Sequence, residues 1–189
     1  MPLRNSLFRY IVLLVLFGQT AFGLAQTTYS INAEKSELRF EVSHMGFLTV
    51  EGVFKEFSGK IVYGTKLETL EINVKSNSIF THNQSRDTSL KEPSYLDTKK
   101  YPLIQFTTLK TYGFEDERTI TGFLTIKNSR RRVQVPYSCI ANKEKGAVLL
   151  TARTSIYRTD FGLEFGPMDQ LVGNEIKLEI MLVAFLTNK

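Results

Sequence analysis

Hydrophobic and polar residues alternate along most of this chain beyond its first 25 residues. In the stretch SELRFEVSH, for example, Leu38, Phe40 and Val42 fall on one face, and charged residues fall between them. Because successive side chains of a β-strand point to opposite sides, a period of two predicts a strand with one buried face. The pattern therefore predicts a half-buried strand at residues 36–44.

Seven further segments repeat this alternation. They are TVEGVFKEFSGKIVY, ETLEINVKS, PLIQFTTLKTY, RTITGFLTIKN, RRVQVPYSCI, GAVLLTARTSIY and NEIKLEIMLVAFL. Tight turns such as SGK, YGT, KNSR and NKEKG connect the strands, and no segment has the pattern of a long amphipathic helix. We therefore expect an all-β domain of eight to nine strands, joined as an antiparallel meander.

An antiparallel sheet of this size has to protect its edges, either as a closed barrel or as a two-layer sandwich. The alternation alone does not choose between them. In the last segment, IMLVAFL is apolar on both faces, which indicates that both faces are covered or that one of them lines an apolar cavity. An eight-stranded up-and-down barrel is wide enough to hold one slender ligand.

One connection is much longer than the others. It takes more than twenty residues, from Ser78 to Pro102, and loops of that length in a compact domain are uncommon and usually functional. Within it, NQSRDTSLKE has the composition of one or two helical turns, capped by Asn83 or Ser85, with Leu90 facing inward. Three apolar anchors follow: Tyr95, Leu96 and Tyr101. We expect an ordered flap over one end of the sheet.

The first 25 residues have the pattern of a secretory signal peptide. A basic start, MPLRNSLFR, precedes the apolar run YIVLLVLFG, and small residues lie before Gln26. The apolar run is about half the length of the roughly twenty residues that a membrane span requires. We predict a leader at residues 1–25 and one mature domain at residues 26–189, in a chain of ordinary composition with 42% hydrophobic and 23% charged residues.

Charge and cysteine content narrow the functions that the chain can have. Loss of Arg4 and Arg9 with the leader lowers the formal net charge from +5 to +3, which is too small an excess for a nucleic-acid-binding surface. The cluster Arg130–Arg132 is typical of a solvated hairpin turn. Cys139 is the only cysteine, so no intramolecular disulfide can form, and its strand-like surroundings predict a buried thiol.

The sequence offers little for catalysis or metal binding. It contains no Gly-x-Ser-x-Gly elbow and no glycine-rich phosphate loop. The spacing of His44, His82 and Cys139 matches no known set of metal ligands. We therefore expect a protein that is not an enzyme and that uses no metal or cofactor.

Five stretches occur in a characteristic order between Tyr29 and Leu186. They are YSINAEKSELRFEVSHMGFLTVEGVFKEFSGKI, SNSIFTHNQSRDTSLKEPSYLDTKKYPLIQF, ITGFLTIKN, YRTDFGL and VGNEIKLEI. Each is a weak signal alone, but in this order they resemble the YceI-like family of lipid-binding or polyisoprenoid-binding proteins. The resemblance covers essentially the whole predicted mature chain.

The resemblance implies an extended eight-stranded antiparallel lipocalin-like barrel, with a short helical segment in the long loop. It implies a bacterial protein exported to the periplasm, whose interior holds a polyisoprenoid or a similar long apolar lipid, such as a quinone or polyprenyl tail, for transport, storage or sequestration. A transient contact with a membrane surface and a homodimer are both compatible with it, whereas a nucleic-acid partner is not expected.

On this interpretation, the inward faces of the strands form an apolar tunnel. The candidate lining residues are Leu38, Phe40, Val42, Ile72, Val74, Ile104, Phe106, Leu124, Ile126, Val148 and Leu150. Candidate contacts for a polar head group are His44, Arg86, Asp87 and Arg158. Each of these four has a structural alternative: a strand end for His44, the start of a helix that fixes the flap for Arg86 and Asp87, and a bend within YRTDFGL for Arg158.

Two other functions are compatible with the sequence. An enzyme acting on an isoprenoid lipid would use His44 as acid or base, and Arg86 or Arg158 to hold an anionic head group. A barrel filled by its own side chains would instead act through its surface, with Arg130–Arg132 touching partners or an anionic membrane. A packed interior would select this last function.

Overall fold

The computed structural model describes residues 26–112, 118–142 and 144–187, so the predicted leader at residues 1–25 lies outside the described residues. Eleven strand segments occur in these ranges: β1 (Thr27–Ile31), β2 (Glu37–His44), β3 (Leu48–Phe54), β4 (Phe57–Tyr63), β5 (Leu67–Lys75), β6 (Ile79–Phe80), β7 (Leu103–Tyr112), β8 (Thr119–Ile126), β9 (Ser129–Asn142), β10 (Ala147–Tyr157) and β11 (Val172–Leu186). The described helices are α2 (Gln84–Lys91) and the 3-10 helices η1 (Ala33–Lys35), η2 (Ser76–Ser78), η3 (Arg158–Phe161) and η4 (Gly166–Leu171).

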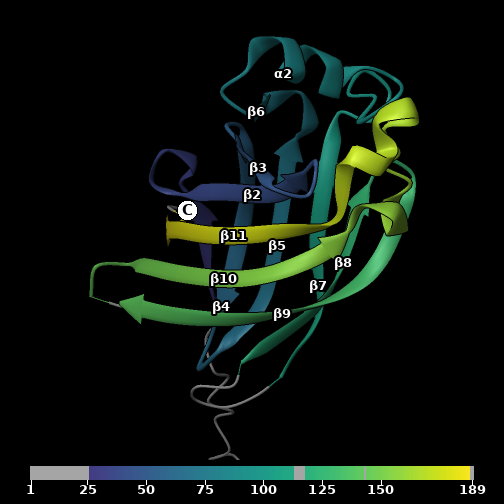
Figure 1. The fold of residues 1–189 in the computed structure, drawn as a ribbon. Helices are drawn as coiled ribbons and strands as arrows, with labels where there is room; N and C mark the ends of the chain where they lie inside the picture. Colours follow the sequence, from purple (N-terminus) through teal and green to yellow (C-terminus); the bar gives the residue numbers. More distant parts are fainter. Residues whose placement is uncertain (1–25, 113–117, 143, 188–189) are drawn as a thin grey trace, which may run out of the picture.

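The strands form one antiparallel sheet that closes on itself (Figure 1). The hydrogen-bonded order around the ring is β1, β4, β5, β7, β8, β9, β10 and β11, and β11 pairs again with β1. Tyr29 of β1 shows the closure, because it pairs with Ile61 of β4 on one side and with Leu186 of β11 on the other. The predicted eight-stranded antiparallel barrel is confirmed, and the sandwich is excluded.

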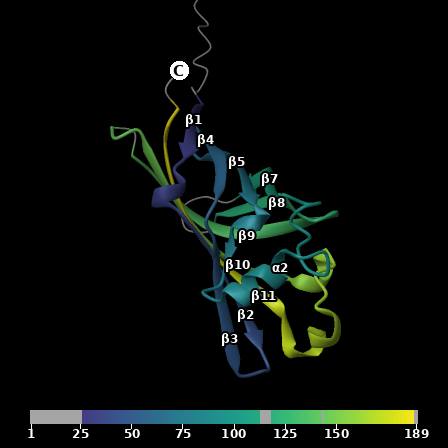
Figure 2. The same cartoon turned by 90° about the horizontal axis from the view of Figure 1, so that it is seen from above.

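The short segments β2, β3 and β6 continue three strands of this ring beyond a bend. β2 pairs with β11 and β3, and β6 pairs with β3. At the bend between β1 and β2, Asn32 Oδ1 accepts a hydrogen bond from the Lys35 N–H and caps η1, while Ser36 Oγ accepts one from the Val183 N–H. These bonds satisfy backbone groups that the break removes from the ladder. Figure 2 shows β2 and β3 projecting together on one side of the barrel.

The two ends of the barrel differ in how they are filled. At the first, which we call the packed end, apolar side chains that are at most 4% exposed fill the interior: Tyr29, Ile61, Leu67, Val148, Leu182 and Ala184. At the other, which we call the lid end, α2 and the helices η3 and η4 lie over the strands (Figure 1). A second apolar cluster, which includes Ile79, Leu96 and Phe161, lies under these helices.

Some local expectations were wrong. The stretch SGK was expected to turn, but Gly59 lies inside β4, where a Cβ would overlap the Glu71 carbonyl of the neighbouring strand β5. Arg130–Arg132 lie within β9, because the turn before it takes only Lys127 and Asn128. The strand β1 was not predicted, since TTYSI is short and has a single buried side chain.

Candidate functional site

An apolar cavity of about 580 Å³ extends from the middle of the barrel to the lid end. Its wall consists mainly of inward-facing side chains from β2, β5, β7, β8, β10 and β11. Ligand pockets in proteins measure about 300–1,000 Å³, so this cavity is large enough for a small molecule. One water molecule takes about 30 Å³ in the liquid, so the cavity has the volume of roughly twenty water molecules.

The structure places most of the predicted tunnel residues in this wall. They are Leu38, Phe40, Val42, Ile72, Val74, Ile104, Phe106, Leu124, Ile126 and Leu150. Val148 lies outside the lining, although it faces inward as the alternation requires. It precedes Leu150 by one pleat repeat of β10 and is buried opposite Ala184 at the packed end. The contact of these residues with a ligand stays a prediction.

The helix predicted in the long connection is present and forms part of the lid. It is α2, and the Asn83 side chain caps it by accepting a hydrogen bond of 3.0 Å from the Arg86 N–H. Its last turn carries Leu90 to the cavity lining. The predicted cap, helix and inward Leu90 are therefore confirmed, and the long connection is a flap over the lid end.

The residues after α2 close the lid against the connection between β10 and β11. Tyr95 and Leu96 both line the cavity, as anchors should, whereas Tyr101 is half-buried outside it. The Tyr95 ring lies 5.1 Å from the Phe165 ring, measured between centroids. Since Phe165 belongs to the other connection, this contact joins the two segments that cover the cavity.

Arg86 and Asp87 hold α2 against the end of β6 by binding Thr81 together. Asp87 Oδ1 accepts hydrogen bonds from the Thr81 N–H at 2.8 Å and from its hydroxyl at 2.6 Å. Arg86 donates from Nε to Thr81 Oγ1 at 2.8 Å and from Nη2 to the Thr81 carbonyl at 2.7 Å. Asp87 is buried and does not line the cavity, so its position fits the structural role of fixing the flap. Arg86 lines the cavity, and these bonds do not use its Nη1.

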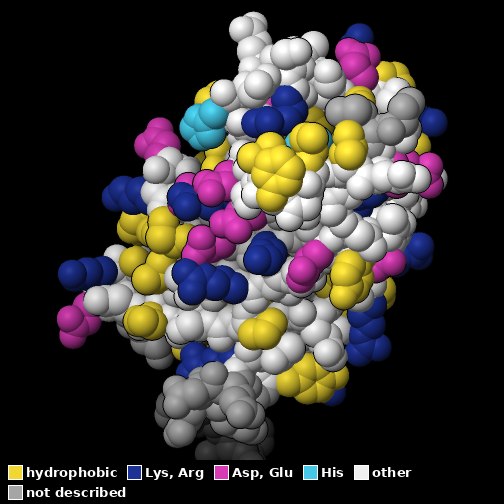
Figure 3. Space-filling model, viewed as in Figure 1, with side chains coloured by type: hydrophobic (Ala, Val, Ile, Leu, Met, Phe, Trp, Pro, Cys, Tyr) yellow, Lys and Arg dark blue, Asp and Glu magenta, His cyan; other side chains and the backbone are white. Residues whose placement is uncertain are grey.

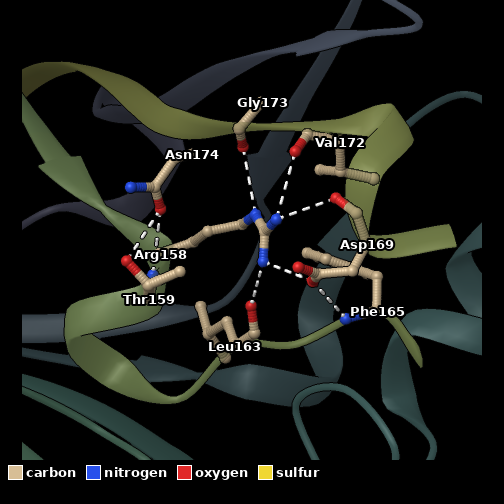
Figure 4. Close-up of polar contacts among 8 residues, drawn as sticks. All are labelled: Arg158, Thr159, Leu163, Phe165, Asp169, Val172, Gly173 and Asn174. Atoms are coloured by element: carbon tan, nitrogen blue, oxygen red, sulfur yellow. Dashed lines mark hydrogen bonds and ion pairs between the residues drawn. The ribbon is translucent and has the colours of Figure 1, made fainter. Parts of the chain in front are cut away.

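Arg158 holds together the connection between β10 and β11, which we call the second connection (Figure 4). Its side chain donates from Nε to the Gly173 carbonyl, from Nη1 to the Leu163 carbonyl and Asp169 Oδ1, and from Nη2 to the Asp169 and Val172 carbonyls, at 2.6–3.1 Å. A guanidinium has five N–H groups, and all of them are used here. Arg158 borders the cavity and is 3% exposed, but it has no free donor for a head group.

The bend around Arg158 has the geometry that YRTDFGL predicts. Gly162 ends η3 with a left-handed φ of 63°, which a glycine adopts without strain. The hydrogen bond from Arg158, assisted by one from the Phe165 N–H at 2.9 Å, lowers the pKa of Asp169 below its ordinary value. Asp169 is therefore a carboxylate that fixes the connection.

His44 lies at the end of β2, where it pairs with Leu48 of β3 and Val172 of β11 and lines the cavity. Within the part of the chain that the structure describes, its ring forms no hydrogen bond or ion pair. The lid contributes further polar lining groups: Asn83, Ser85, Arg86 and Ser89. The cavity thus has an apolar wall and a polar margin formed by His44 and the lid.

Several lining residues were not among the sequence candidates. Three of them, Ile176, Leu178 and Ile180, share a predicted face of the last strand, so the alternation could have identified them as lining residues. Leu163 and Phe165 lie in an irregular connection, where no periodicity exists to mark them. No cluster of three or more His, Cys, Asp or Glu side chains that could hold a metal occurs among the described residues.

No helix in the described ranges is both long enough and apolar enough to span a bilayer.

A closed eight-stranded antiparallel barrel around an apolar cavity is a lipocalin-like architecture. The sequence model of the YceI-like domain family matches residues 29–184, and the chain belongs to this family. Protein YceI of Escherichia coli O157:H7 is 27% identical over 165 residues, which cover 80% of this chain and 85% of that protein.

Solved structures show the same fold. BcnA of Burkholderia cenocepacia aligns with a TM-score of 0.75 at 22% identity, over 82% of this chain and 99% of that one. A polyisoprenoid binding domain from Saccharophagus degradans aligns with a TM-score of 0.67 at 16% identity, over 85% of this chain and 99% of that one. At these identities the likeness concerns the fold.

Proposed function

We propose that this protein carries or stores a polyisoprenoid, or a similar long apolar lipid, inside its barrel. The observation that supports this most directly is the cavity of about 580 Å³ with its apolar wall. Each buried methylene contributes roughly 0.8 kcal/mol, so a hydrocarbon tail binds such a wall without a charged anchor. The description of the Saccharophagus degradans domain as polyisoprenoid binding supports the same class of ligand.

The polar margin suggests how the ligand is oriented. Its tail lies along the wall toward Leu150, and a polar head group lies at the lid end beside His44 and Arg86. Among the described residues, no group is hydrogen-bonded to the His44 ring or to Arg86 Nη1, whereas all donors of Arg158 are used. The leader pattern of residues 1–25 supports a periplasmic location for this carrier, where an apolar molecule needs a protein to cross water.

The two alternatives have less support. A barrel that acts only through its surface does not need an internal cavity of this volume. An enzyme would need a second group to position or activate His44, and among the described residues no carboxylate or hydroxyl is hydrogen-bonded to its ring.

The test compares the lipid content of variants that differ in one aromatic ring. Ala152 is buried and lines the cavity, whereas its neighbour Thr151 is exposed on the outer face. The chain and the variants Ala152→Phe and Thr151→Phe are purified and extracted with organic solvent, and mass spectrometry measures the lipid bound. We expect Ala152→Phe to lose most of the lipid and Thr151→Phe to retain it.

A clean extract from the unmodified chain, with no rise in melting temperature on adding a prenyl quinone, would refute carriage. Turnover of an isoprenoid substrate that His44→Ala abolishes would support the enzyme instead.

A further inference from the structure

A small apolar patch projects beside the margin of the cavity. It consists of Met45, Phe47 and Leu48 at the end of the β2–β3 hairpin and Leu171 at the end of η4, and we call it the apolar tip. Phe47 is 77% exposed, and the other three are 38–48% exposed. The Met45 N–H donates to the Leu171 carbonyl at 2.7 Å, which joins the two segments. Figure 3 shows hydrophobic side chains gathered over the end of β2.

The turn itself does not require apolar residues. Met45 has a φ of 56° and Gly46 a φ of 77°, and positions with positive φ favour Gly, Asn or Asp. A methionine therefore stands where Asn would suit the backbone better. An aromatic ring as exposed as that of Phe47 likewise gains nothing from the fold. Both residues indicate that the tip contacts something outside the barrel.

The distribution of charge around the tip fits a lipid bilayer. Between Val42 and Val50 the chain has no Asp, Glu, Lys or Arg. On the hairpin, the first charged residues are Glu41 and Glu51, which face each other in the β2–β3 ladder. On the other segment, Asp169 lies two residues before Leu171, and its charge is paired with that of Arg158. Glu51 lies three residues from Leu48, or about 10 Å along a strand. Apolar groups of interfacial proteins enter a membrane surface by about 5–10 Å, so the charge-free length matches that depth.

The size of the tip argues against a stable protein partner, including a second copy of this chain. A large apolar side chain has an accessible surface of roughly 200 Å², so four that are about half exposed offer on the order of 400 Å². A stable interface takes about 800 Å² from each partner. A small, projecting, apolar hairpin end is suited to insertion between lipid head groups, where no complementary surface is needed.

We propose that the apolar tip inserts into the surface of a phospholipid bilayer and sets the cavity margin against the lipid. His44 and Val172, which adjoin the tip, both line the cavity. A molecule leaving the bilayer at this point reaches the cavity without crossing water. Insertion of the tip does not itself depend on isoprenoid binding, so the two proposals can fail separately.

The test uses the absence of tryptophan from this chain. In the full chain, Phe47→Trp places one fluorescent probe at the tip. Ile140→Trp places the control probe on β9, at another apolar side chain that is 65% exposed. Each variant is mixed with phosphatidylcholine vesicles whose acyl chains are brominated, and which contain no isoprenoid. Residues 1–25 are the same in both variants, so their own affinity for lipid acts equally on both.

We expect the emission of the Phe47→Trp variant to shift to the blue and to be quenched by the bromine atoms, while the emission of the Ile140→Trp variant is unaffected. Adding Met45→Asn and Leu48→Ser to the Phe47→Trp chain should weaken vesicle binding about tenfold or more. Quenching of the tip probe that does not exceed that of the control probe would overturn the proposal. So would a blue shift without vesicles that grows with protein concentration, because it would show a second copy on the tip.

Discussion

The ring of Phe40 covers Gly52, its cross-strand partner in the β2–β3 hairpin. A Cβ at residue 52 would overlap the Cζ and Cε1 atoms of this ring. The ring of Phe106 on β7 covers Gly122 of β8 in a similar way, although it does so diagonally, because Gly122 pairs with Thr108. Both phenylalanines line the cavity, and the two glycines let their rings lie close to the sheet, which leaves more of the interior open.

Replacing Gly52 by Ala should therefore reduce the capacity of the cavity. The new methyl group would displace the Phe40 ring toward the interior, and overpacking of this kind costs about 1–3 kcal/mol. Urea unfolding should show the loss of stability, and extraction should show less bound lipid. Adding Phe40→Leu to Gly52→Ala should restore part of both. Unchanged stability and lipid content in Gly52→Ala would contradict this account.

Arg158, whose five N–H groups all donate hydrogen bonds, should be essential for the stability of the second connection. Arg158→Met leaves Asp169 and four carbonyls without their donor, and a hydrogen bond to a charged group contributes about 1.5–3 kcal/mol. The matched control is Arg153→Met, because Arg153 forms its ion pair with Glu179 in an exposed position. We expect a large fall in the urea midpoint for Arg158→Met and little change for the control. Equal effects would refute the structural role of Arg158.

Asp169 should make part of the stability dependent on pH. Its pKa is lower in the folded chain than in the unfolded chain, because Arg158 stabilises the carboxylate. The contribution is therefore complete above the unfolded pKa of about 3.9 and disappears as pH falls through the lower folded pKa. The difference in melting temperature between the unmodified chain and Asp169→Asn should shrink over that acidic window. A difference that is constant with pH would contradict the assignment.

The thiol of Cys139 should be unreactive in the folded protein. Burial raises its pKa to about 11, so at pH 7.5 fewer than about one molecule in a thousand carries the thiolate that attacks disulfide reagents. Ellman's reagent should show almost no reaction with the native chain, and one equivalent after unfolding in guanidinium chloride. Rapid stoichiometric labelling of the native chain would show that the packed end opens readily.

Thr81 should control how firmly α2 is held as a lid. Thr81→Val removes the hydroxyl that accepts from Arg86 and donates to Asp87, at a cost of about 1–1.5 kcal/mol. Hydrogen exchange of the α2 amides should become roughly tenfold faster while the barrel strands keep their protection. Thr88→Val, on the exposed side of the helix, is the control. Faster exchange throughout the barrel would mean that Thr81 supports the whole fold instead.

The alternation of apolar residues was enough to predict the longer strands and the faces that point inward, but not the short strands β1 and β6. Phe40, Ile72 and Leu150 were assigned correctly to the inner face because side chains along a strand repeat every two residues, whatever the strand pairs with. The capped helix α2 was also predictable, since Asn83 caps it through a contact three residues away. Such properties depend on near neighbours along the chain.

The position of each inward-facing residue along the barrel and the roles of the polar groups depended on the tertiary structure. Val148 has the same alternation as Leu150, yet only the register of β10 against β11 places it below the cavity. From the sequence, Arg158 was a candidate head-group contact. The structure shows that its donors are used by carbonyls elsewhere in the chain, the most distant in sequence being that of Gly173.

By itself, then, the sequence determined an all-β chain, the side chains of each predicted strand that point inward, and a long ordered flap. Local periodicity and capping act over a few residues, so these features can be predicted from the sequence. Only the tertiary structure decided that β1 and β11 close the ring, where the cavity ends and which polar groups remain free. Those features arise from pairings between segments far apart in the chain, and a period of two contains no information about them.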